Sequence, residues 1–257
     1  MKQYDGYLFD LDGTIYLGEE LIPGADETVA RLRERGARVQ FLSNKPIARR
    51  ESYATKLSKL GIPCTPEDVV NSPLASARYL ASEHAGERVM VMGEAPLRQE
   101  LLDAGVELTQ VVDETDILLV SWDREVCWPQ MDAAHQALVR GAGFFATNPD
   151  TVCPLEGGAT VPDCGAMIAY LEASTGRQLE VMIGKPSPII TRMALAEIGL
   201  EAGQCLMIGD RLDTDMAMGS TAGLDTALVL TGVTDREKLN ASNVEPTWVL
   251  DSVAGIE

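Results

Sequence analysis

The chain has 257 residues, enough to bury a substantial core as one large domain or two small ones. Its formal net charge of −18, without a basic tract, argues against a protein that wraps a nucleic acid polymer or binds an anionic membrane surface. Hydrophobic residues make up 46% of the sequence and charged residues 23%, the composition of an ordinary soluble globular protein.

The cysteines indicate a reducing compartment. There are five, they are scattered, and no two form a Cys-x-x-Cys pair, so reduced thiols in the cytoplasm are expected. With only two histidines to assist, a zinc site is not expected. No apolar stretch approaches the roughly 20 residues of a membrane span, and residues 1–5 do not begin a signal peptide. No membrane partner is therefore predicted.

Apolar runs and helical patterns alternate along the chain, and glycines close most of the helices. In the first part, the expected elements are a strand at 6–9, a helix at 25–35, a strand at 37–42, a helix ending near Leu60, a strand at 69–70 and a helix capped by Ser72. In the middle part, they are strands at 89–92, 117–120 and 144–146 and helices at 96–104, 128–140 and 163–175. In the last part, they are strands at 180–183, 205–208, 226–230 and 248–250, a helix at 187–198 and a helix capped by Asp213. This alternation predicts an α/β fold with a mostly parallel sheet covered by helices on both faces.

Four of the predicted strands end at, or one glycine before, a polar residue. The four residues are Asp10, Ser43, Lys185 and Asp210. In open parallel sheets, ligands bind beyond the carboxyl ends of the strands. If the four strands are neighbours, two carboxylates, a hydroxyl and an ammonium meet at one edge of the sheet.

The first of these strand ends carries a second carboxylate. Asp10 and Asp12 are two residues apart, so they start on the same side of the strand, which Gly13 ends. Carboxylates this close repel each other unless a cation lies between them or one of them holds a proton. The pair indicates a hard metal site or an acid/base pair, with an acidic turn as the structural alternative.

The combined set suits phosphoryl transfer. Mg²⁺ binds few protein carboxylates and shares phosphate oxygens with the substrate, so Asp10 and Asp210 would hold it. Ser43 and the N–H groups after it would donate hydrogen bonds to the phosphate, and Lys185 would neutralise charge that builds up in the transition state. A carboxylate can also attack phosphorus and form an aspartyl phosphate.

Other sites with related patterns fit less well. A calcium-binding EF-hand loop beginning at Asp10 would need glycine and glutamate where Ile15 and Leu21 stand. A P-loop would need serine or threonine after Lys185, where the chain has Pro186. A Ser-His-Asp hydrolase would need a paired histidine, and both histidines fall inside predicted helices.

Four motifs, in order, resemble those of the haloacid dehalogenase (HAD) superfamily. They are residues 10–14 (Asp-Leu-Asp-Gly-Thr), residues 43–45 (Ser-Asn-Lys), Lys185 in Gly-Lys-Pro, and residues 209–215 (Gly-Asp-Arg-Leu-Asp-Thr-Asp). Residues 147–150 (Thr-Asn-Pro-Asp) and 184–188 (Gly-Lys-Pro-Ser-Pro) are similar to the NagD-like, p-nitrophenyl phosphatase branch, subfamily IIA. Together these motifs cover the whole chain.

The resemblance implies a role for each motif residue. Asp10 would be the nucleophile and a metal ligand. Asp12 would be the general acid and then the general base, with its backbone carbonyl on the metal. Asp210 would be a further metal ligand, and Asp215 would orient metal-bound waters or the lysine of the third motif. The implied phosphate-binding residues are Ser43, Asn44 and Lys185.

The implied fold is a three-layer, doubly wound parallel-sheet core, Rossmann-like, with an inserted α/β cap. Few residues separate the Asp10 loop from the next helix, whereas the interval between Ser43 and Lys185 holds a complete α/β block. This block resembles the family's C2-type cap, which closes over the site and selects the substrate. The expected domains are a catalytic core at 1–76 and 180–257 and a cap at 77–179. The implied substrate-loop residues of the cap are Asn148, Asp150 and Cys153.

We therefore expect a Mg²⁺-dependent phosphatase that hydrolyses small phosphate monoesters through an aspartyl phosphate. The resemblance implies small phosphorylated metabolites as partners, with nucleoside monophosphates, sugar phosphates and p-nitrophenyl phosphate as substrates. The alternative is a non-catalytic, metal-dependent phosphate-binding or regulatory protein, against which the second carboxylate, Asp12, argues. Phosphotransfer to another hydroxyl, as in mutases of the superfamily, is disfavoured by the position of the long insertion.

Two further expectations concern the cap. The loop at 151–159 has no histidine or aromatic side chain, which counts against a pyridoxal phosphate specialist, and Glu156 is expected to face solvent. Members of the family often dimerise through the cap, so the resemblance implies that a homodimer is one expected assembly.

Overall fold

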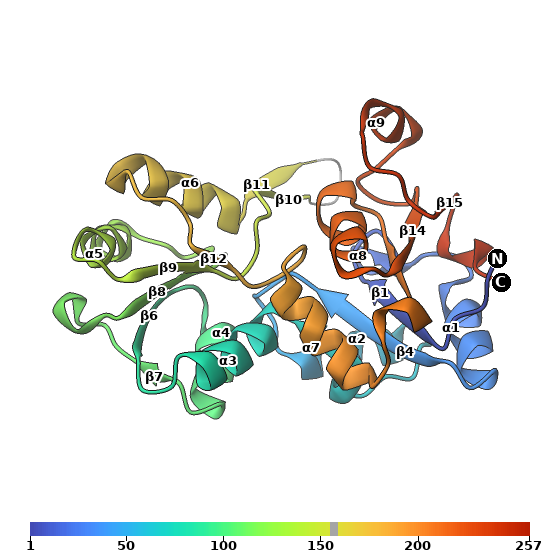
Figure 1. The fold of residues 1–257 in the computed structure, drawn as a ribbon, viewed down its shortest axis with the longest axis horizontal. Helices are drawn as coiled ribbons and strands as arrows, with labels where there is room; N and C mark the ends of the chain where they lie inside the picture. The colour runs from blue at the N-terminus through green and yellow to red at the C-terminus, as the bar shows by residue number, and fades with distance from the viewer. Residues whose placement is uncertain (155–158) are drawn as a thin grey trace. The chain divides into compact units, whose positions relative to one another are not determined.

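A computed structural model of the chain describes residues 1–154 and 159–257 (Figure 1). The chain divides into two compact units. Unit 1 comprises Met1–Ser43, Arg50–Val70 and Lys185–Glu257, and unit 2 comprises Asn44–Arg49 and Asn71–Gly184. The chain therefore passes between the units four times, after Ser43, Arg49, Val70 and Gly184.

Unit 1 is built on a six-stranded sheet in which the first strand is central. The strand order is β15 (Trp248–Leu250), β14 (Asp225–Val229), β13 (Cys205–Gly209), β1 (Gly6–Asp10), β4 (Arg38–Ser43) and β5 (Val69–Asn71). The pairings of β1 with β4 and β13, of β13 with β14 and of β14 with β15 are parallel. The expected α/β fold with a parallel sheet is confirmed.

The order of the strands places a topological switch at the centre of this sheet. From β1 the chain passes through α1 (Ala25–Glu34) to β4 on one side, and from β13 through α8 (Ala217–Ala222) to β14 on the other. Because crossovers between parallel strands are right-handed, α1 and α8 cover opposite faces. The side chains at the ends of β1 and β13 thus lie where doubly wound sheets bind ligands.

Burial explains why these segments are strands. Leu8, Phe9, Phe41, Leu206 and Ile208 are fully buried, as expected for strands that are covered on both faces. Unit 1 also contains the hairpin of β2 (Tyr16–Leu17) and β3 (Glu20–Leu21), the helices α2 (Arg50–Lys59), α7 (Pro188–Ile198) and α9 (Arg236–Ala241), a π-helical turn at Leu212–Met216, and short 3-10 turns.

Unit 2 has a parallel sheet of its own. The order is β12 (Val181–Met182), β9 (Gly143–Ala146), β8 (Ile117–Val120), β6 (Arg88–Met92) and β7 (Glu107–Leu108). Its other elements are the helices α3 (Ser72–Glu83), α4 (Ala95–Asp103), α5 (Trp128–Val139) and α6 (Cys164–Thr175) and the antiparallel hairpin of β10 (Val152–Pro154) and β11 (Thr160–Pro162). One face of the sheet packs on a core that includes Leu118, Val120, Phe144 and Leu171.

The strand before Lys185 was expected in the catalytic sheet, and this expectation is wrong. Val181 pairs with Phe145 of β9, so β12 completes the sheet of unit 2. A short apolar strand carries no local information about its partner, because pairing is decided by distant residues. The longer segment of unit 2, Asn71–Gly184, accordingly extends beyond the expected cap at 77–179 at both ends.

Two predicted helix caps are also wrong. The side chain of Asn71, rather than Ser72, caps α3 by accepting a hydrogen bond from the N–H of Leu74 at 3.1 Å. Asp213 does not cap a helix but lies inside the π-helical turn, where it forms an ion pair with Arg211.

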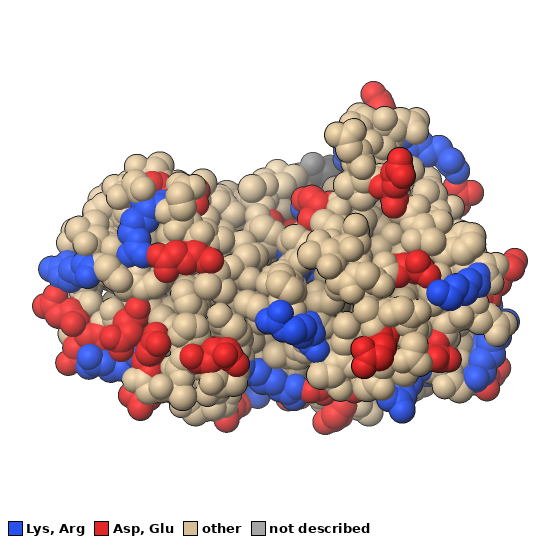
Figure 2. Space-filling model, in the orientation of Figure 1, with Lys and Arg blue, Asp and Glu red and all other residues tan. Residues whose placement is uncertain are grey.

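The surface carries charges of both signs. On the face seen in Figure 2, lysine and arginine side chains stand among aspartates and glutamates. Across residues 1–154 and 159–257, no helix combines the length and the hydropathy needed to cross a bilayer.

Candidate active site

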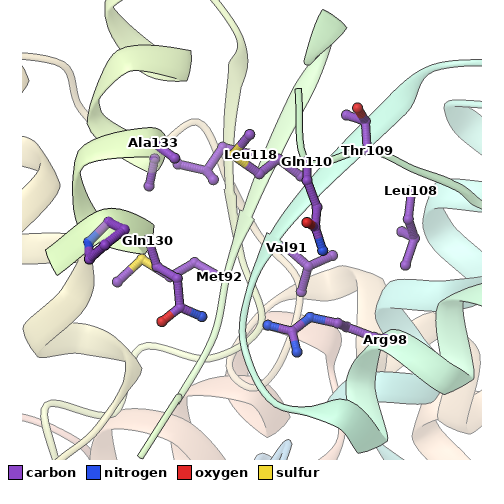
Figure 3. A pocket seen from close by; sticks show the side chains of 12 residues that line it. Val91, Met92, Arg98, Leu108, Thr109, Gln110, Leu118, Gln130 and Ala133 are labelled. Atoms are coloured by element: carbon purple, nitrogen blue, oxygen red, sulfur yellow. The ribbon is translucent and has the colours of Figure 1, made fainter. Parts of the chain in front are cut away.

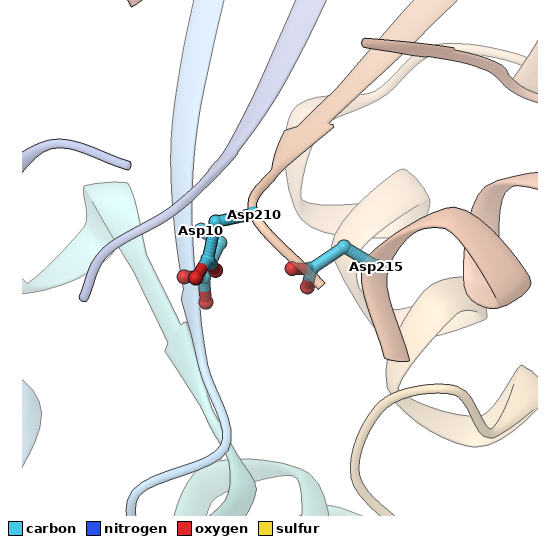
Figure 4. A group of neighbouring side chains, drawn as sticks. All are labelled: Asp10, Asp210 and Asp215. Atoms are coloured by element: carbon cyan, nitrogen blue, oxygen red, sulfur yellow. The ribbon is translucent and has the colours of Figure 1, made fainter. Parts of the chain in front are cut away.

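Three carboxylates meet where β1 and β13 end. Oxygen atoms of Asp10, Asp210 and Asp215 all lie within 4.8 Å of one another (Figure 4). Asp10 is the last residue of β1, Asp210 directly follows β13, and Asp215 lies in the π-helical turn after it. The structure therefore brings Asp10 and Asp210 together, the arrangement expected if their strands are neighbours.

Lys185 joins two of the carboxylates. Its Nζ donates hydrogen bonds to Asp10 Oδ1 at 2.5 Å and to Asp215 Oδ1 at 2.7 Å, and the lysine side chain is only 3% exposed. Burial by itself lowers the pKa of Lys185, but the two carboxylates outweigh this effect and raise the pKa above its ordinary value. Lys185 is thus a buried ammonium whose charge is held by its partners.

The two carboxylate oxygens of Asp210 differ in their hydrogen bonding. Its Oδ2 accepts a hydrogen bond from the N–H of Val233 at 2.6 Å. Its Oδ1 is buried and has no hydrogen-bond partner among the residues that the structure describes. Burial raises the pKa of Asp210 to about 7, and the charge of Asp215 adds to this effect. Since an unpaired buried carboxylate oxygen is costly, this atom is suited to bind a cation.

The nearest residues that follow Asp10 form a tight turn. The main-chain nitrogens of Thr14, Ile15 and Tyr16 lie 2.9–3.2 Å from the carbonyl oxygen of Leu11. The main chains of Asp12 and Tyr16 pair in an isolated β-bridge. Asp12 is partly exposed in this turn, two residues from Asp10. A proton donor or acceptor at this position remains accessible to a ligand bound at Asp10.

Ser43 reaches the same edge through the register of the sheet. Asp10 pairs with Leu42 of β4, so Ser43 is the next residue of the neighbouring strand, where it is buried. Asn44 belongs to unit 2, where its Nδ2 donates a hydrogen bond to Asp150 Oδ2 at 3.1 Å. The structure thus brings Ser43 to the carboxylates, while the Asn44 side chain takes part in a polar network of unit 2.

The residues predicted for the substrate loop are mostly buried within unit 2. Asn148 Nδ2 donates hydrogen bonds to Asp150 Oδ2 and Asp163 Oδ1, each at 3.0 Å. Cys153, on β10, is 4% exposed and packs in the core of unit 2. Glu156 lies outside the described residues, so its expected exposure stays a prediction.

A loop that the motifs did not reveal completes the site. Residues 231–234 follow β14 on the edge of the sheet that holds the carboxylates. Thr231 Oγ1 donates to the carbonyl oxygen of Gly13 at 2.6 Å, and Val233 donates to Asp210. The sequence signal was present, because this strand also ends just before a polar Thr-Gly pair, but no charged residue marks it.

Comparisons with known proteins decide the family. Residues 7–107 match the model of the haloacid dehalogenase-like hydrolases, and residues 182–256 match a second, HAD-hydrolase-like model. The chain is 38% identical to the 5'-nucleotidase YutF of Bacillus subtilis over 98% of its own length and 97% of that relative. The chain belongs to the haloacid dehalogenase-like hydrolases.

Two further members of the family are similar over almost the whole chain. The acid sugar phosphatase of Staphylococcus aureus is 36% identical over 96% of this chain and 95% of that protein. The p-nitrophenyl phosphatase from Archaeoglobus fulgidus has a TM-score of 0.93 and 35% identity, covering 98% of each chain. The predicted branch, that of NagD and the p-nitrophenyl phosphatases, is confirmed, and so are its fold class, a Rossmann-like core with an inserted cap, and its activity. This HAD hydrolase is a phosphatase for small phosphate monoesters.

Phosphatases of this family generally use a divalent metal ion, and the site fits one. Three carboxylates face a single ammonium, so a cation would relieve their mutual repulsion. The unpaired Oδ1 of Asp210 and the carboxylate of Asp10 would hold the ion. Both ligands are oxygens, the donor type that hard divalent cations prefer.

Metal binding should be visible in the pH dependence of stability. In metal-free protein, the pKa of Asp210 lies near 7 in the folded state, above the ordinary value near 4 of an unfolded chain. The folded state then holds the extra proton, so Asp210 alone makes the free energy of unfolding fall by about 4 kcal/mol as the pH rises from about 4 to 7. Burial also raises the pKa of Asp10, which adds to the fall in the same direction. Denaturant unfolding in EDTA at several pH values measures this loss. Added Mg²⁺ should restore stability most at pH 7 and above, and a metal effect that is equal at pH 5 and pH 8 would contradict the assignment.

Close packing against glycine fixes the position of Asp210. A Cβ on Gly232 would lie 2.0 Å from Asp210 Oδ2, whereas a Cβ on Gly203 would have no atom of a contacting described residue within 4 Å. We predict that Gly232→Ala displaces the Asp210 carboxylate and lowers phosphatase activity at limiting metal about ten- to hundredfold, since small displacements in a catalytic site are costly. Gly203→Ala is the matched control. Equal activity of the two variants across a Mg²⁺ titration would show that Asp210 tolerates displacement.

Proposed function

We propose that this phosphatase is Mg²⁺-dependent and that Asp10 attacks the phosphorus atom of the substrate. The observation that carries the proposal is the difference in exposure among the clustered carboxylates. The Asp10 side chain is 13% exposed, whereas that of Asp215 is fully buried and Asp210 is 1% exposed. Among these three aspartates, Asp10 is the one that a substrate can reach.

The reaction then proceeds in two displacements at phosphorus. In the first, an Asp10 carboxylate oxygen bonds to phosphorus, the ester P–O bond breaks, and Asp12 gives its proton to the leaving oxygen. In the second, Asp12 takes a proton from water, the water oxygen bonds to phosphorus, and the Asp10–phosphorus bond breaks. Inorganic phosphate leaves and both aspartates return to their starting states.

The surrounding residues stabilise charge during these steps. Lys185 places its ammonium against Asp10, and Ser43 would donate a hydrogen bond to the phosphate, with the main chain at Asn44 beside it. When bound to Asp10, Asp210 and the Asp12 carbonyl, Mg²⁺ would screen the charges of phosphate and nucleophile. Asp215, held by Lys185 and by the N–H of Arg211 at 3.2 Å, would keep the lysine in place.

We infer that the enzyme accepts several kinds of small monoester. Two relatives of nearly equal identity carry the names 5'-nucleotidase and acid sugar phosphatase, so overall similarity favours neither nucleoside monophosphates nor sugar phosphates. Unit 2 is proposed to be the cap that selects among them, through residues that include Asn148, Asp150 and Cys153. A homodimer formed through the cap is part of the same proposal.

The proposed cellular location is the cytoplasm. The five cysteines are all free thiols, which supports a reducing environment.

The test is a steady-state assay of the purified enzyme with p-nitrophenyl phosphate, a nucleoside monophosphate and a hexose phosphate. Each substrate is measured with Mg²⁺ and with EDTA. We expect hydrolysis that requires metal, with kcat/KM values that overlap among the substrates. Hydrolysis that is unaffected by EDTA would refute the metal requirement. Phosphate binding without hydrolysis of any monoester would favour the non-catalytic alternative.

A further inference from the structure

Unit 2 contains a cavity that the proposed reaction does not use. Its volume is about 320 Å³, within the size range of small-molecule sites (Figure 3). Its walls come from the strands β6 and β8, the helices α4 and α5, and the segment after β7. The residues that matter for the argument are Met90, Met92, Leu108, Leu118, Ala133 and Arg98.

The cavity exists because β7 is shorter than the strand beside it. β7 ends at Leu108, whereas β6 continues to Met92. The N–H of Thr109 still donates to the carbonyl oxygen of Val89 at 3.0 Å. In a strand, alternate residues direct their main-chain groups to the same side, so Val91 presents its N–H and C=O where β7 no longer covers the edge. Val91 is part of the cavity wall and offers a ligand both a donor and an acceptor.

The guanidinium of Arg98 lines this apolar space. In the part of the chain that the structure describes, the Arg98 guanidinium forms no ion pair and no side-chain hydrogen bond. Its charge acts on Glu94, one turn earlier. Both Glu94 carboxylate oxygens, however, accept hydrogen bonds from Arg124, whose Nε and Nη2 lie 2.7 and 2.8 Å away. In Figure 3, the Arg98 side chain extends from α4 toward the cavity.

We propose that this cavity binds a small organic monoanion, an aromatic carboxylate. The methionine, leucine and alanine side chains suit an apolar ring, and methionine adapts to irregular shapes and contacts aromatic faces. A single guanidinium matches one carboxylate through two parallel hydrogen bonds. A phosphate ester carries roughly two negative charges, and the net charge of the chain is already −18. Among the described residues of the wall, Arg98 is the one cation that could balance them. The site lies within unit 2, whereas the catalytic carboxylates lie within unit 1.

Met90 and Met92 lie in the wall of the cavity, so their methyl signals can report binding directly. The full-length protein is labelled with ¹³C at its ten methionine methyl groups, and 3-phenylpropionate is titrated while the methyl signals are recorded. Met90→Leu and Met92→Leu assign the two signals, and Met207 of unit 1 serves as the internal reference. The neutral analogue 3-phenylpropionamide tests the need for charge. Arg98→Gln removes the cation, and Arg140→Gln, at the far end of α5, removes an arginine outside the wall.

We expect saturable shifts of the Met90 and Met92 signals, with Met207 unchanged. Binding should weaken at least tenfold for the amide and for Arg98→Gln, and stay unchanged for Arg140→Gln. No shift at Met90 and Met92 would overturn the proposal. Equal binding of acid and amide, or equal binding by Arg98→Gln and wild type, would overturn the assignment of a carboxylate site. Thermal unfolding of each variant confirms that the comparison is between folded proteins.

Discussion

Replacing Asp10 with asparagine should lower kcat/KM for p-nitrophenyl phosphate by about 10⁴-fold or more, because the attacking oxygen is lost and nothing else in the site can form the covalent intermediate. The fold should survive, since an asparagine Oδ1 can still accept the hydrogen bond from Lys185. A steady-state assay with Mg²⁺, together with a thermal unfolding curve, measures both effects.

The control for this variant is Asp132→Asn, which removes an exposed carboxylate from α5. It should leave activity unchanged. Traces of other phosphatases in a preparation limit the lowest activity that can be measured. The variant and the wild type are therefore purified identically and compared at several enzyme concentrations. If Asp10→Asn retains a tenth or more of wild-type activity, Asp10 is not the nucleophile.

Replacing Lys185 with methionine should damage both activity and stability. Without the ammonium, kcat is expected to fall about 10²- to 10³-fold, as for the loss of other preorganised groups that stabilise transition-state charge. The carboxylates of Asp10 and Asp215 would also lose their shared cation, a change that costs about 3–5 kcal/mol of unfolding free energy for buried pairs. Urea unfolding in EDTA at pH 8 measures the loss. The loss should shrink as the pH falls and Asp10, whose pKa is raised by burial, takes up a proton.

A second variant separates the two effects of the lysine. Adding Asp215→Asn to Lys185→Met removes one of the stranded carboxylates, so part of the stability should return while activity stays low. Lys59→Met, at an exposed position of α2, controls for the removal of a lysine. If Lys185→Met is as stable as the wild type at pH 8 in EDTA, the ion pairs of Lys185 do not stabilise these carboxylates.

Much of the core could be predicted from the sequence because its signals are local. The apolar runs that form β1, β4 and β13 are short, and each leads to a polar or charged residue that can bind a ligand. Parallel sheets collect the carboxyl ends of their strands on one edge, so Asp10 and Asp210 were expected to meet if their strands are neighbours, and β1 and β13 do pair.

Partner choice and close packing could not be predicted in this way. The strand before Lys185 reads like the others, but its partner is Phe145, far away in the chain. The contact of Gly232 with Asp210 likewise depends on how two loops pack against each other. The hydrophobic periodicity of the sequence does not predict such packing. A loop was expected at 151–159, whereas Val152–Pro154 form β10. Because alternate residues of a strand face the same side, Cys153 packs in the core of unit 2.

The central claim, that Asp10 carries the phosphoryl group, is tested most directly by trapping. The enzyme is mixed with p-nitrophenyl phosphate and Mg²⁺, quenched in acid within one turnover and reduced with borohydride, which converts an aspartyl phosphate to homoserine. Mass spectrometry of the peptide that spans residues 6–14 then locates the change. We predict homoserine at position 10 only when substrate is present, and more of it in Asp12→Asn, whose second displacement is slowed. An unmodified Asp10 in an active enzyme, or a phosphoryl group found on another residue, would contradict the mechanism.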